Sequence, residues 1–186
     1  MSKETSLDNK LDRRRVAPKG RFRHPRLYLV GEAPGAEEAA QGKPFVGPAG
    51  RALREMLELA GIDPKQVRLA NAIPFRPFSH ATRRRLRNRS PTIEEVDRYG
   101  AAVLADIRRS KPIVIVALGS TAAGLLGEHR SIQVARKATL QFEGFALQVT
   151  FHPAYARRFG GPHGRIWRQT VDDLRGAWRE SEAIRA

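Results

Sequence analysis

Four short apolar runs along the chain predict the strands of a buried sheet. The apolar runs cover residues 27–30, 67–70, 113–118 and 146–151, and longer segments of mixed polarity separate them. The run at 113–118 is apolar at every position, which is typical of a central parallel strand covered on both faces. A shorter, hairpin-like stretch over residues 139–142 precedes the last run.

Apolar positions at helical spacing predict helices between these strands. In the first of them, apolar side chains recur every three to four positions, and Gly61 follows as a natural C-terminal stop. Thr92 and Glu95 form the capping-box pattern that begins a second helix. Together the helices are expected over residues 48–60, 92–109, 119–126 and from 164 onward.

The alternation of strands and helices predicts an α/β fold. We expect a three-layer α/β/α arrangement around a mostly parallel sheet of about four strands. Residues 1–25 lack apolar periodicity and contain Pro18, Gly20 and Pro25, so they are expected to form a flexible basic arm. A single catalytic domain is expected to span residues 26–186.

In such sheets the chemistry lies at the carboxyl ends of the strands. That rule selects four places in this chain: the loop Gly31–Pro34, Asn71, the turn Gly119–Thr121, and His152.

The charge of the chain is concentrated in three segments. Among 186 residues, 34 are Lys or Arg and 19 are Asp or Glu, so the formal net charge is +15. Residues 1–26, 76–89 and 157–168 carry net charges of +6, +6 and +4, and the remainder is close to neutral. One such run is often a solvated face, but three of the same sign indicate a polyanionic partner, most commonly nucleic acid.

The composition excludes several classes of protein and site. The chain has no cysteine, which excludes disulfides, thiolate metal sites and a cysteine nucleophile. No apolar run approaches the ~20 residues that span a bilayer, and residues 1–15 lack the apolar middle of a secretory signal. The histidines other than His152, which are His24, His80, His129 and His163, show no metal-ligand spacing. We expect a cytoplasmic, nucleoid-associated protein with no metal, no membrane contact and a monomeric state.

Five motifs in a defined order resemble the uracil-DNA glycosylase superfamily, and most closely its family 4, over roughly residues 27–174. Each motif alone is weak. They are Gly-Glu-Ala-Pro-Gly at 31–35 with a later carboxylate at Glu38, Lys-Pro-Phe-Val-Gly at 43–47, the strand ending in Asn71, Ile-Val-Ala-Leu-Gly-Ser-Thr-Ala at 115–122, and His-Pro-Ala-Tyr at 152–155.

The chain departs from family 4 in two respects. Members of that family hold an iron-sulfur cluster on four cysteines; this chain has none, so no cofactor is expected, and aromatic packing of Phe75 and Tyr99 is expected in its place. The basic segment 76–89 is also longer than usual. It is similar to the arginine-rich loop of a related clade that traps abasic DNA through a histidine, but Asn88 or a neighbour falls near that position and His80 is the only histidine of the loop. Covalent trapping is therefore not implied.

The resemblance implies a role for each motif residue in removing uracil. A base inside a duplex is out of reach and must be flipped into a pocket, where Phe45 would stack on it. The Asn71 amide would pair with a uracil carbonyl and N3–H, and Gly31 and Ala33 belong to the same pocket. The alternatives from the residues alone are a core Phe at position 45 and an Asx turn at Asn71.

The catalytic roles fall on three residues. His152 would donate to uracil O2 as negative charge develops there. Glu32 would stabilise the cationic sugar and orient or activate water, with Glu38 as a second contributor. The alternative for Glu38 is a solvated turn.

Contacts to DNA are expected from two other groups. Ala154–Arg158 would enter the minor groove, with Tyr155 or Arg157 filling the gap left by the flipped base. Gly119, Ser120 and Thr121 would bind a phosphate or form an ordinary turn. The full set of expected DNA contacts is Arg83, Arg84, Arg85, Arg87, Ser120, Tyr155, Arg157 and Arg158.

The leading hypothesis is a monofunctional uracil-DNA glycosylase of base-excision repair that binds DNA containing uracil or abasic sites, with tight product binding left open. The alternative is an abasic-site or damaged-DNA binding protein with weak or no base excision, suggested by the Arg-rich segment. A third hypothesis is an enzyme that acts on free nucleosides. The three basic segments disfavour it, because a small substrate does not require them.

Overall fold

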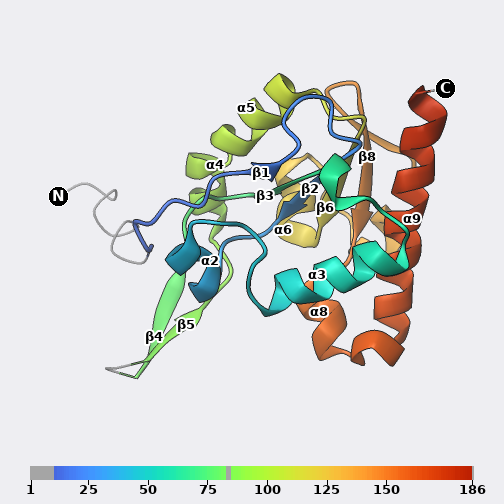
Figure 1. The fold of residues 1–186 in the computed structure, drawn as a ribbon. Coiled ribbons are helices and arrows are strands. Elements are labelled where there is room, and N and C mark those ends of the chain that lie inside the picture. Colours follow the sequence, from blue (N-terminus) through green and yellow to red (C-terminus); the bar gives the residue numbers. More distant parts are fainter. Residues whose placement is uncertain (1–10, 83–84, 186) are drawn as a thin grey trace.

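The computed structural model describes residues 11–82 and 85–185. At its centre is a six-stranded sheet in the order β1-β3-β2-β6-β8-β7 (Figure 1). Strands β3, β2, β6 and β8 pair in parallel, and β1 and β7 add antiparallel edges. The predicted parallel sheet of four strands is confirmed. The strand bounds are β1 (Lys19–Gly20), β2 (Leu27–Gly31), β3 (Val67–Asn71), β6 (Val114–Leu118), β7 (Leu140–Phe142) and β8 (Phe145–Thr150).

Helices cover both faces of the sheet and produce the three layers that the sequence predicts (Figure 1). Alternate residues of β2 point to opposite faces: Leu27 and Leu29 belong to one apolar core, and Tyr28 and Val30 to the other. The first core is covered by α3 (Pro48–Leu59), α8 (Pro153–Arg158) and α9 (Arg165–Arg185). The second is covered by α5 (Ala101–Ser110), α6 (Ser120–Leu125) and α7 (Ile132–Ala135).

The predicted capping box is present, but the helix that it begins is shorter than expected. Thr92 and Glu95 exchange side-chain and backbone hydrogen bonds at the start of α4 (Ile93–Tyr99). The chain then continues as α5 after Gly100. A Cβ on Gly100 would lie 2.5 Å from Leu125 Cδ1, so a residue without a side chain lets this junction pack against α6.

Two segments predicted as loops contain regular structure. The loop at 31–47 holds α2 (Ala36–Gln41), and the basic segment folds in part into an antiparallel hairpin of β4 (Phe78–Thr82) and β5 (Arg85–Asn88). The hairpin projects away from the sheet (Figure 1). Its strands carry too few apolar residues for the period-2 pattern by which strands are recognised. Two 3₁₀ turns, η1 (Pro64–Gln66) and η2 (Gly161–His163), complete the described elements.

The predicted flexible arm over residues 1–25 is wrong for residues 11–25. Leu11 and Val16 are buried, and β1 joins the sheet beside β3. Backbone hydrogen bonds from Asp12 N–H to Arg76 and from Val16 N–H to Pro74 hold the segment against the core. Two isolated apolar side chains are enough to anchor it, although they form no periodic pattern. Residues 1–10 lie outside the described residues.

A buried polar cluster ties the second face of the sheet to α5. Asp106 accepts two hydrogen bonds from the Arg68 guanidinium, at 2.7 and 2.9 Å, and one from the Tyr28 hydroxyl at 2.6 Å. Burial by itself raises the pKa of the Asp106 carboxyl, but the hydrogen bonds from Arg68 and Tyr28 outweigh it and lower the pKa. Arg68 also donates to the Gly20 carbonyl, at 3.3 Å, but Asp106 is the acceptor that the two donors share.

Within the described residues, none of the helices combines the length and apolar character that crossing a membrane requires.

Replacing Asp106 with Ala should destabilise the protein by about 3–5 kcal/mol, because a buried guanidinium and a buried hydroxyl lose their acceptor. Urea unfolding followed by circular dichroism measures the change. Asp172→Ala is the matched control: Asp172 also pairs with an arginine, at 2.7 Å, but on the surface, so its loss should stay below about 1 kcal/mol. Equal losses in the two variants would contradict a dependence on burial.

Candidate active site

The candidate site lies at the carboxyl ends of the parallel strands, where the chain leaves β2 toward β3 on one side and β6 lies on the other. This is the position at which open α/β sheets bind ligands. A cavity of about 500 Å³, here called the base pocket, opens there. The predicted site residues in its wall are Glu32, Ala33, Glu38, Phe45, Asn71, His152, Arg157 and Arg158.

Phe45 reaches the base pocket through a strained backbone. Its φ of +55° lies in the left-handed region, which a bulky residue rarely adopts. The Arg54 guanidinium donates to the Phe45 carbonyl at 2.9 Å, and a Cβ on Gly50 would lie only 1.8 Å from that oxygen. Helix α3 therefore supports this conformation of Phe45 in two ways: Arg54 donates a hydrogen bond to its carbonyl, and Gly50 leaves room for that carbonyl.

Gly31 lets the pocket's ring and amide meet. Gly31 and Asn71 are paired residues at the ends of β2 and β3. A Cβ on Gly31 would lie 2.6 Å from Phe45 Cζ and 2.7 Å from Asn71 Oδ1. Since real Cβ atoms do not come so close, any side chain at position 31 must displace the Phe45 ring or the Asn71 amide.

Glu38 is buried, and both of its carboxylate oxygens are occupied. The backbone N–H of Gly35 donates to one oxygen at 3.1 Å and that of Gly47 donates to the other at 2.8 Å. The carboxylate thus joins the loop after β2 to the turn before α3. It is not the solvated turn that the sequence alone left open, and its geometry favours positioning the two loops over direct chemistry.

The Glu32 side chain stands in a different situation. It is partly buried and lines both the base pocket and a neighbouring cavity. Within residues 11–82 and 85–185, its carboxylate has neither a hydrogen-bond nor an ion-pair partner. Of the two predicted carboxylates, Glu32 is therefore the one whose oxygens face the pocket unengaged.

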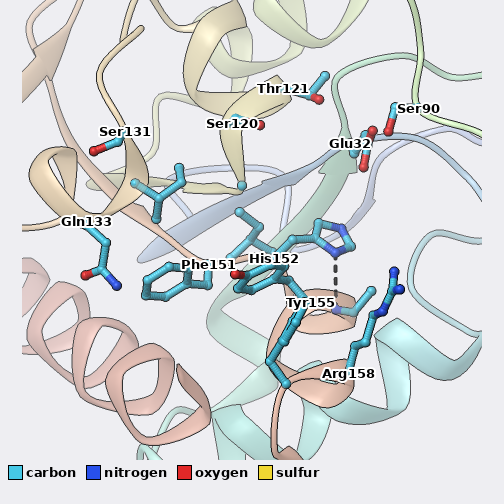
Figure 2. A pocket seen from close by; sticks show the side chains of 15 residues that line it. Glu32, Ser90, Ser120, Thr121, Ser131, Gln133, Phe151, His152, Tyr155 and Arg158 are labelled. Carbon is cyan, nitrogen blue, oxygen red and sulfur yellow. Dashed lines mark hydrogen bonds between the residues drawn. The ribbon is translucent and has the colours of Figure 1, made fainter. Parts of the chain in front are cut away.

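His152 caps α8, and this contact determines which of its nitrogens is protonated. Its Nδ1 accepts a hydrogen bond from the Ala154 backbone N–H at 3.2 Å, so the proton of the neutral ring lies on Nε2 (Figure 2). Burial lowers the pKa of His152, although the negative charges of Glu32 and Glu38 act in the opposite direction. The imidazole is thus held neutral, as a donor.

The hairpin contributes pocket residues that the motif search did not assign. Asn88, Arg89 and Ser90 line the base pocket. Arg76 donates to Asn88 Oδ1 at 2.7 Å and so fixes the orientation of that amide. In the sequence, one observation pointed to this wall of the pocket. The resemblance to the clade with an arginine-rich loop places Asn88 or a neighbour near the histidine by which that clade traps abasic DNA.

Arginines of the basic segment divide into buried and exposed groups. Arg76 is buried, and Arg89 makes a two-pronged ion pair with the fully buried Glu95 of α4, so both fasten the hairpin to the body. Arg87 is exposed on β5. Of the other predicted DNA contacts in the segment, Arg83 and Arg84 lie outside the described residues and Arg85 is described by its backbone alone.

The predicted contacts after His152 divide between two cavities. Arg157 is exposed in the wall of the base pocket, whereas Tyr155 and Ser120 line the neighbouring cavity of about 900 Å³ (Figure 2). Arg158 borders both. The alternative of an ordinary turn at Gly119–Thr121 is also satisfied, because it starts α6, a helix of 6 residues.

Phe75 and Tyr99 pack together as expected for a chain without cluster cysteines. Their rings meet edge to face, with centroids 5.2 Å apart. Residues 11–13 of the N-terminal segment line a small cavity beside them. Among the described residues, no group of three or more His, Asp or Glu side chains is placed to hold a metal ion.

Comparisons with known proteins show which proteins this chain resembles. A type-4 uracil-DNA glycosylase of Thermotoga maritima is 40% identical over 136 residues, which is 72% of this chain and 67% of the relative. One of Pyrobaculum aerophilum is 33% identical over 141 residues, 71% of this chain and 68% of the relative. The crystal structure of wild-type SMUG2 from Pedobacter heparinus has a TM-score of 0.57 at 15% identity, over 84% of this chain and 75% of that one, and shows a shared fold.

The family model described as the uracil DNA glycosylase superfamily matches residues 17–175. It includes every strand of the sheet and both walls of the base pocket. The resemblance drawn from the five motifs is thereby confirmed, and the chain belongs to the uracil DNA glycosylase superfamily.

Proposed function

We propose that this protein excises uracil from DNA by hydrolysing the bond between N1 of the base and C1′ of deoxyribose, leaving an abasic site. The observation that carries the proposal is the content of the base pocket. A single cavity of about 500 Å³ holds an aromatic ring, an amide, a neutral imidazole and an unengaged carboxylate. These four groups supply what the reaction needs: a platform, base recognition, a donor for the leaving anion and a negative charge for the sugar.

Phe45 and Asn71 would select the base. A flipped uracil stacking on the Phe45 ring gains ~1–3 kcal/mol, and the Asn71 amide donates to one carbonyl while accepting from N3–H. Cytosine presents an acceptor and an exocyclic donor at these positions and so mismatches the amide. Gly31, beneath the ring and the amide, supports this function by holding them at the required separation.

His152 would stabilise the leaving uracil. As the C1′–N1 bond breaks, its electron pair stays with the base and negative charge develops on O2. The Nε2–H of His152 donates to that oxygen while Nδ1 stays engaged with the helix backbone. A donor already oriented before the reaction requires no reorganisation when the charge appears.

Glu32 would serve the sugar and the water. Its carboxylate lies where it can stabilise the positive charge on the sugar ring and orient a water molecule toward C1′. As the new C1′–O bond forms, Glu32 accepts the proton that the water releases. Glu38 acts as a positioning residue, since its oxygens are already bound to the two loops that carry Glu32 and Phe45.

DNA would cross the basic surface around the pocket. Arg157 borders the base pocket and is the better placed of the two candidates to fill the gap left by the flipped base. Arg87, Arg158 and Ser120 would contact the backbone. Asn88, Arg89 and Ser90 close one wall of the pocket. Tight binding of the abasic product is therefore part of the proposal. For the same reason, a protein that binds abasic DNA without excising the base is the second candidate.

A single assay separates these two functions. Oligonucleotides containing one uracil are incubated with the protein and then treated with alkali, which breaks the strand at abasic sites. Strand breakage that depends on the protein supports excision. Absence of breakage with folded protein, together with binding of abasic DNA far tighter than of intact DNA, would reject the glycosylase and favour the binder.

Glu32→Gln should lower the excision rate by roughly 10²- to 10⁴-fold with little change in affinity for DNA, because the amide keeps the shape but neither accepts the proton nor stabilises the cation. Single-turnover excision and binding to abasic DNA measure the two effects. Glu37→Gln is the matched control, since that side chain is exposed and lines neither cavity. A rate within threefold of wild type would remove Glu32 from the mechanism.

His152 should be neutral at pH 6.5, where an ordinary histidine is half protonated. Because its pKa is lowered in the folded state, the unfolded chain takes up a proton first as pH falls, and stability should decrease on acidification through this range. Nitrogen NMR of labelled imidazole is expected to show a protonated Nε2 and a bare Nδ1. His152→Asn, which keeps an acceptor at the helix cap, should lose that part of the pH dependence; an imidazolium spectrum at pH 6.5 would contradict the assignment.

Gly31→Ala should reduce kcat/KM for uracil excision by about 10²-fold, because the new methyl group must displace the ring or the amide that recognises the base. Gly176→Ala is the control, since its Cβ would lie no closer than 3.9 Å to Gln148 Oε1. Steady-state excision by both variants checks the expectation. Unchanged kinetics in Gly31→Ala would show that excision does not depend on the positions of the Phe45 ring and the Asn71 amide beside Gly31.

A further inference from the structure

The larger of the two cavities has no part in the chemistry proposed above. It measures about 900 Å³ and adjoins the base pocket, with Glu32, Ser90, His152, Ala154 and Arg158 in both walls. The two cavities therefore meet at the residues proposed to act on the base and the sugar.

Three aromatic side chains line this cavity and contact one another in a row, which we call the aromatic row: Phe151, Tyr155 and Phe159. Figure 2 shows the first two of them. The first two rings are nearly parallel, with centroids 6.0 Å apart, and the second pair lies 4.4 Å apart. Phe151 is buried, but Tyr155 and Phe159 are 46% and 49% exposed. About half of each of these two residues is thus open, in the wall of the cavity, instead of being covered by the core.

The row is rigidly supported from behind. Asp173 of α9 accepts a hydrogen bond from Thr150, at 2.6 Å, and two from Arg136, which follows α7. The Arg136 guanidinium in turn lies 6.0 Å from the Phe151 ring. These contacts fix the end of β8 and the start of the aromatic row.

The cavity also has a polar lining. Ser120, Thr121, Ser131 and Gln133 bring hydroxyl and amide groups to its wall (Figure 2). Hydroxyls and amides both donate and accept, as the edges of nucleobases require.

The segment that follows the aromatic row along the chain is positively charged. Residues 157–168 contain four arginines and no acidic residue. The Arg158 guanidinium lies 5.7 Å from the Phe159 ring and lines the cavity. Aromatic faces combined with a basic track are the signature of binding to single-stranded nucleic acid, where bases stack and phosphates pair with arginines.

We infer that the larger cavity binds an unpaired nucleotide next to the flipped one, with its base stacked on Tyr155 and Phe159. A neighbouring base in a duplex is already stacked within the helix and is not available to this platform, so the site favours single-stranded DNA. The inference rests on the proposed function in taking DNA as the substrate.

Tyr155 accordingly has a role other than filling the gap in a duplex. Its ring contacts those of Phe151 and Phe159, and leaving that row would break both contacts. Arg157, which borders the base pocket, is unaffected by this assignment.

The test compares the affinities of wild type and of variants for DNA strands that differ by one base, and it requires no excision. Single-stranded oligonucleotides carry a stable abasic analogue in the position of the flipped nucleotide, and each flanking base within three nucleotides is removed in turn with the same analogue. For wild type, removing one particular base should weaken binding by roughly 5- to 150-fold, the equivalent of ~1–3 kcal/mol of stacking. In Tyr155→Ala and Phe159→Ala, binding of the unmodified strand should already be weakened, and removal of that base should cost little more.

Two further variants control for other causes. Tyr155→Phe keeps the ring and should restore the response to base removal. Phe22→Ala removes an aromatic side chain that is 42% exposed within another basic segment but lines neither cavity, and it should keep the full response. Circular dichroism establishes that each variant is folded.

The outcomes separate this inference from the proposed function. Equal sensitivity to base removal in wild type and in both Ala variants, at every flanking position, would overturn it, as would failure of wild type to bind the single strand. Excision of uracil by wild type is measured on the same strands. If wild type excises uracil but the loss of affinity on base removal does not depend on Tyr155 and Phe159, only the nucleotide site is rejected. If that loss depends on the two residues but uracil is not excised, the site is supported and the glycosylase is rejected.

Discussion

Parallel pairing of four strands is the constraint on which the site depends. Strands β3, β2, β6 and β8 are distant in sequence, yet their parallel register brings their carboxyl ends to one edge. Backbone hydrogen bonds continue this alignment past the strands: Ala72 N–H donates to Gly31, and Gly119 N–H donates to Thr150. Glu32, Asn71 and His152 therefore meet in one place without any direct contact between them being required.

Around that edge, the loops are held by a small number of specific contacts. The Glu38 carboxylate joins two loops through backbone N–H groups, and Arg54 holds the left-handed Phe45 from α3. Strain at a residue that faces a pocket persists only where its surroundings over-determine it. Here the surroundings are a buried carboxylate, an arginine and two glycines, Gly31 and Gly50, so the pocket is organised before a base arrives.

The excess of positive charge has both structural and surface components. Arg68, Arg76 and Arg89 are held by acceptors inside the protein and act as fasteners for the sheet and the hairpin. Arg87, Arg157 and Arg158 are exposed and are free to meet phosphates. The net charge of the sequence is consistent with a nucleic-acid partner, but only the exposed arginines produce a field that DNA can encounter.

The sequence alone was sufficient for the core strands, for the helices α3 and α9 and for the family, because apolar periodicity and the order of the motifs are local properties. It misplaced the start of the ordered chain, since Leu11 and Val16 are stabilised by partners distant in sequence. It missed the hairpin because β4 and β5 carry too few apolar residues to show an alternating pattern. The difference between Glu32 and Glu38, the strain at Phe45 and the entry of Asn88 into the pocket were likewise decided by tertiary structure. Each depends on which backbone groups and side chains approach across the fold, and these distances are not encoded in any local pattern.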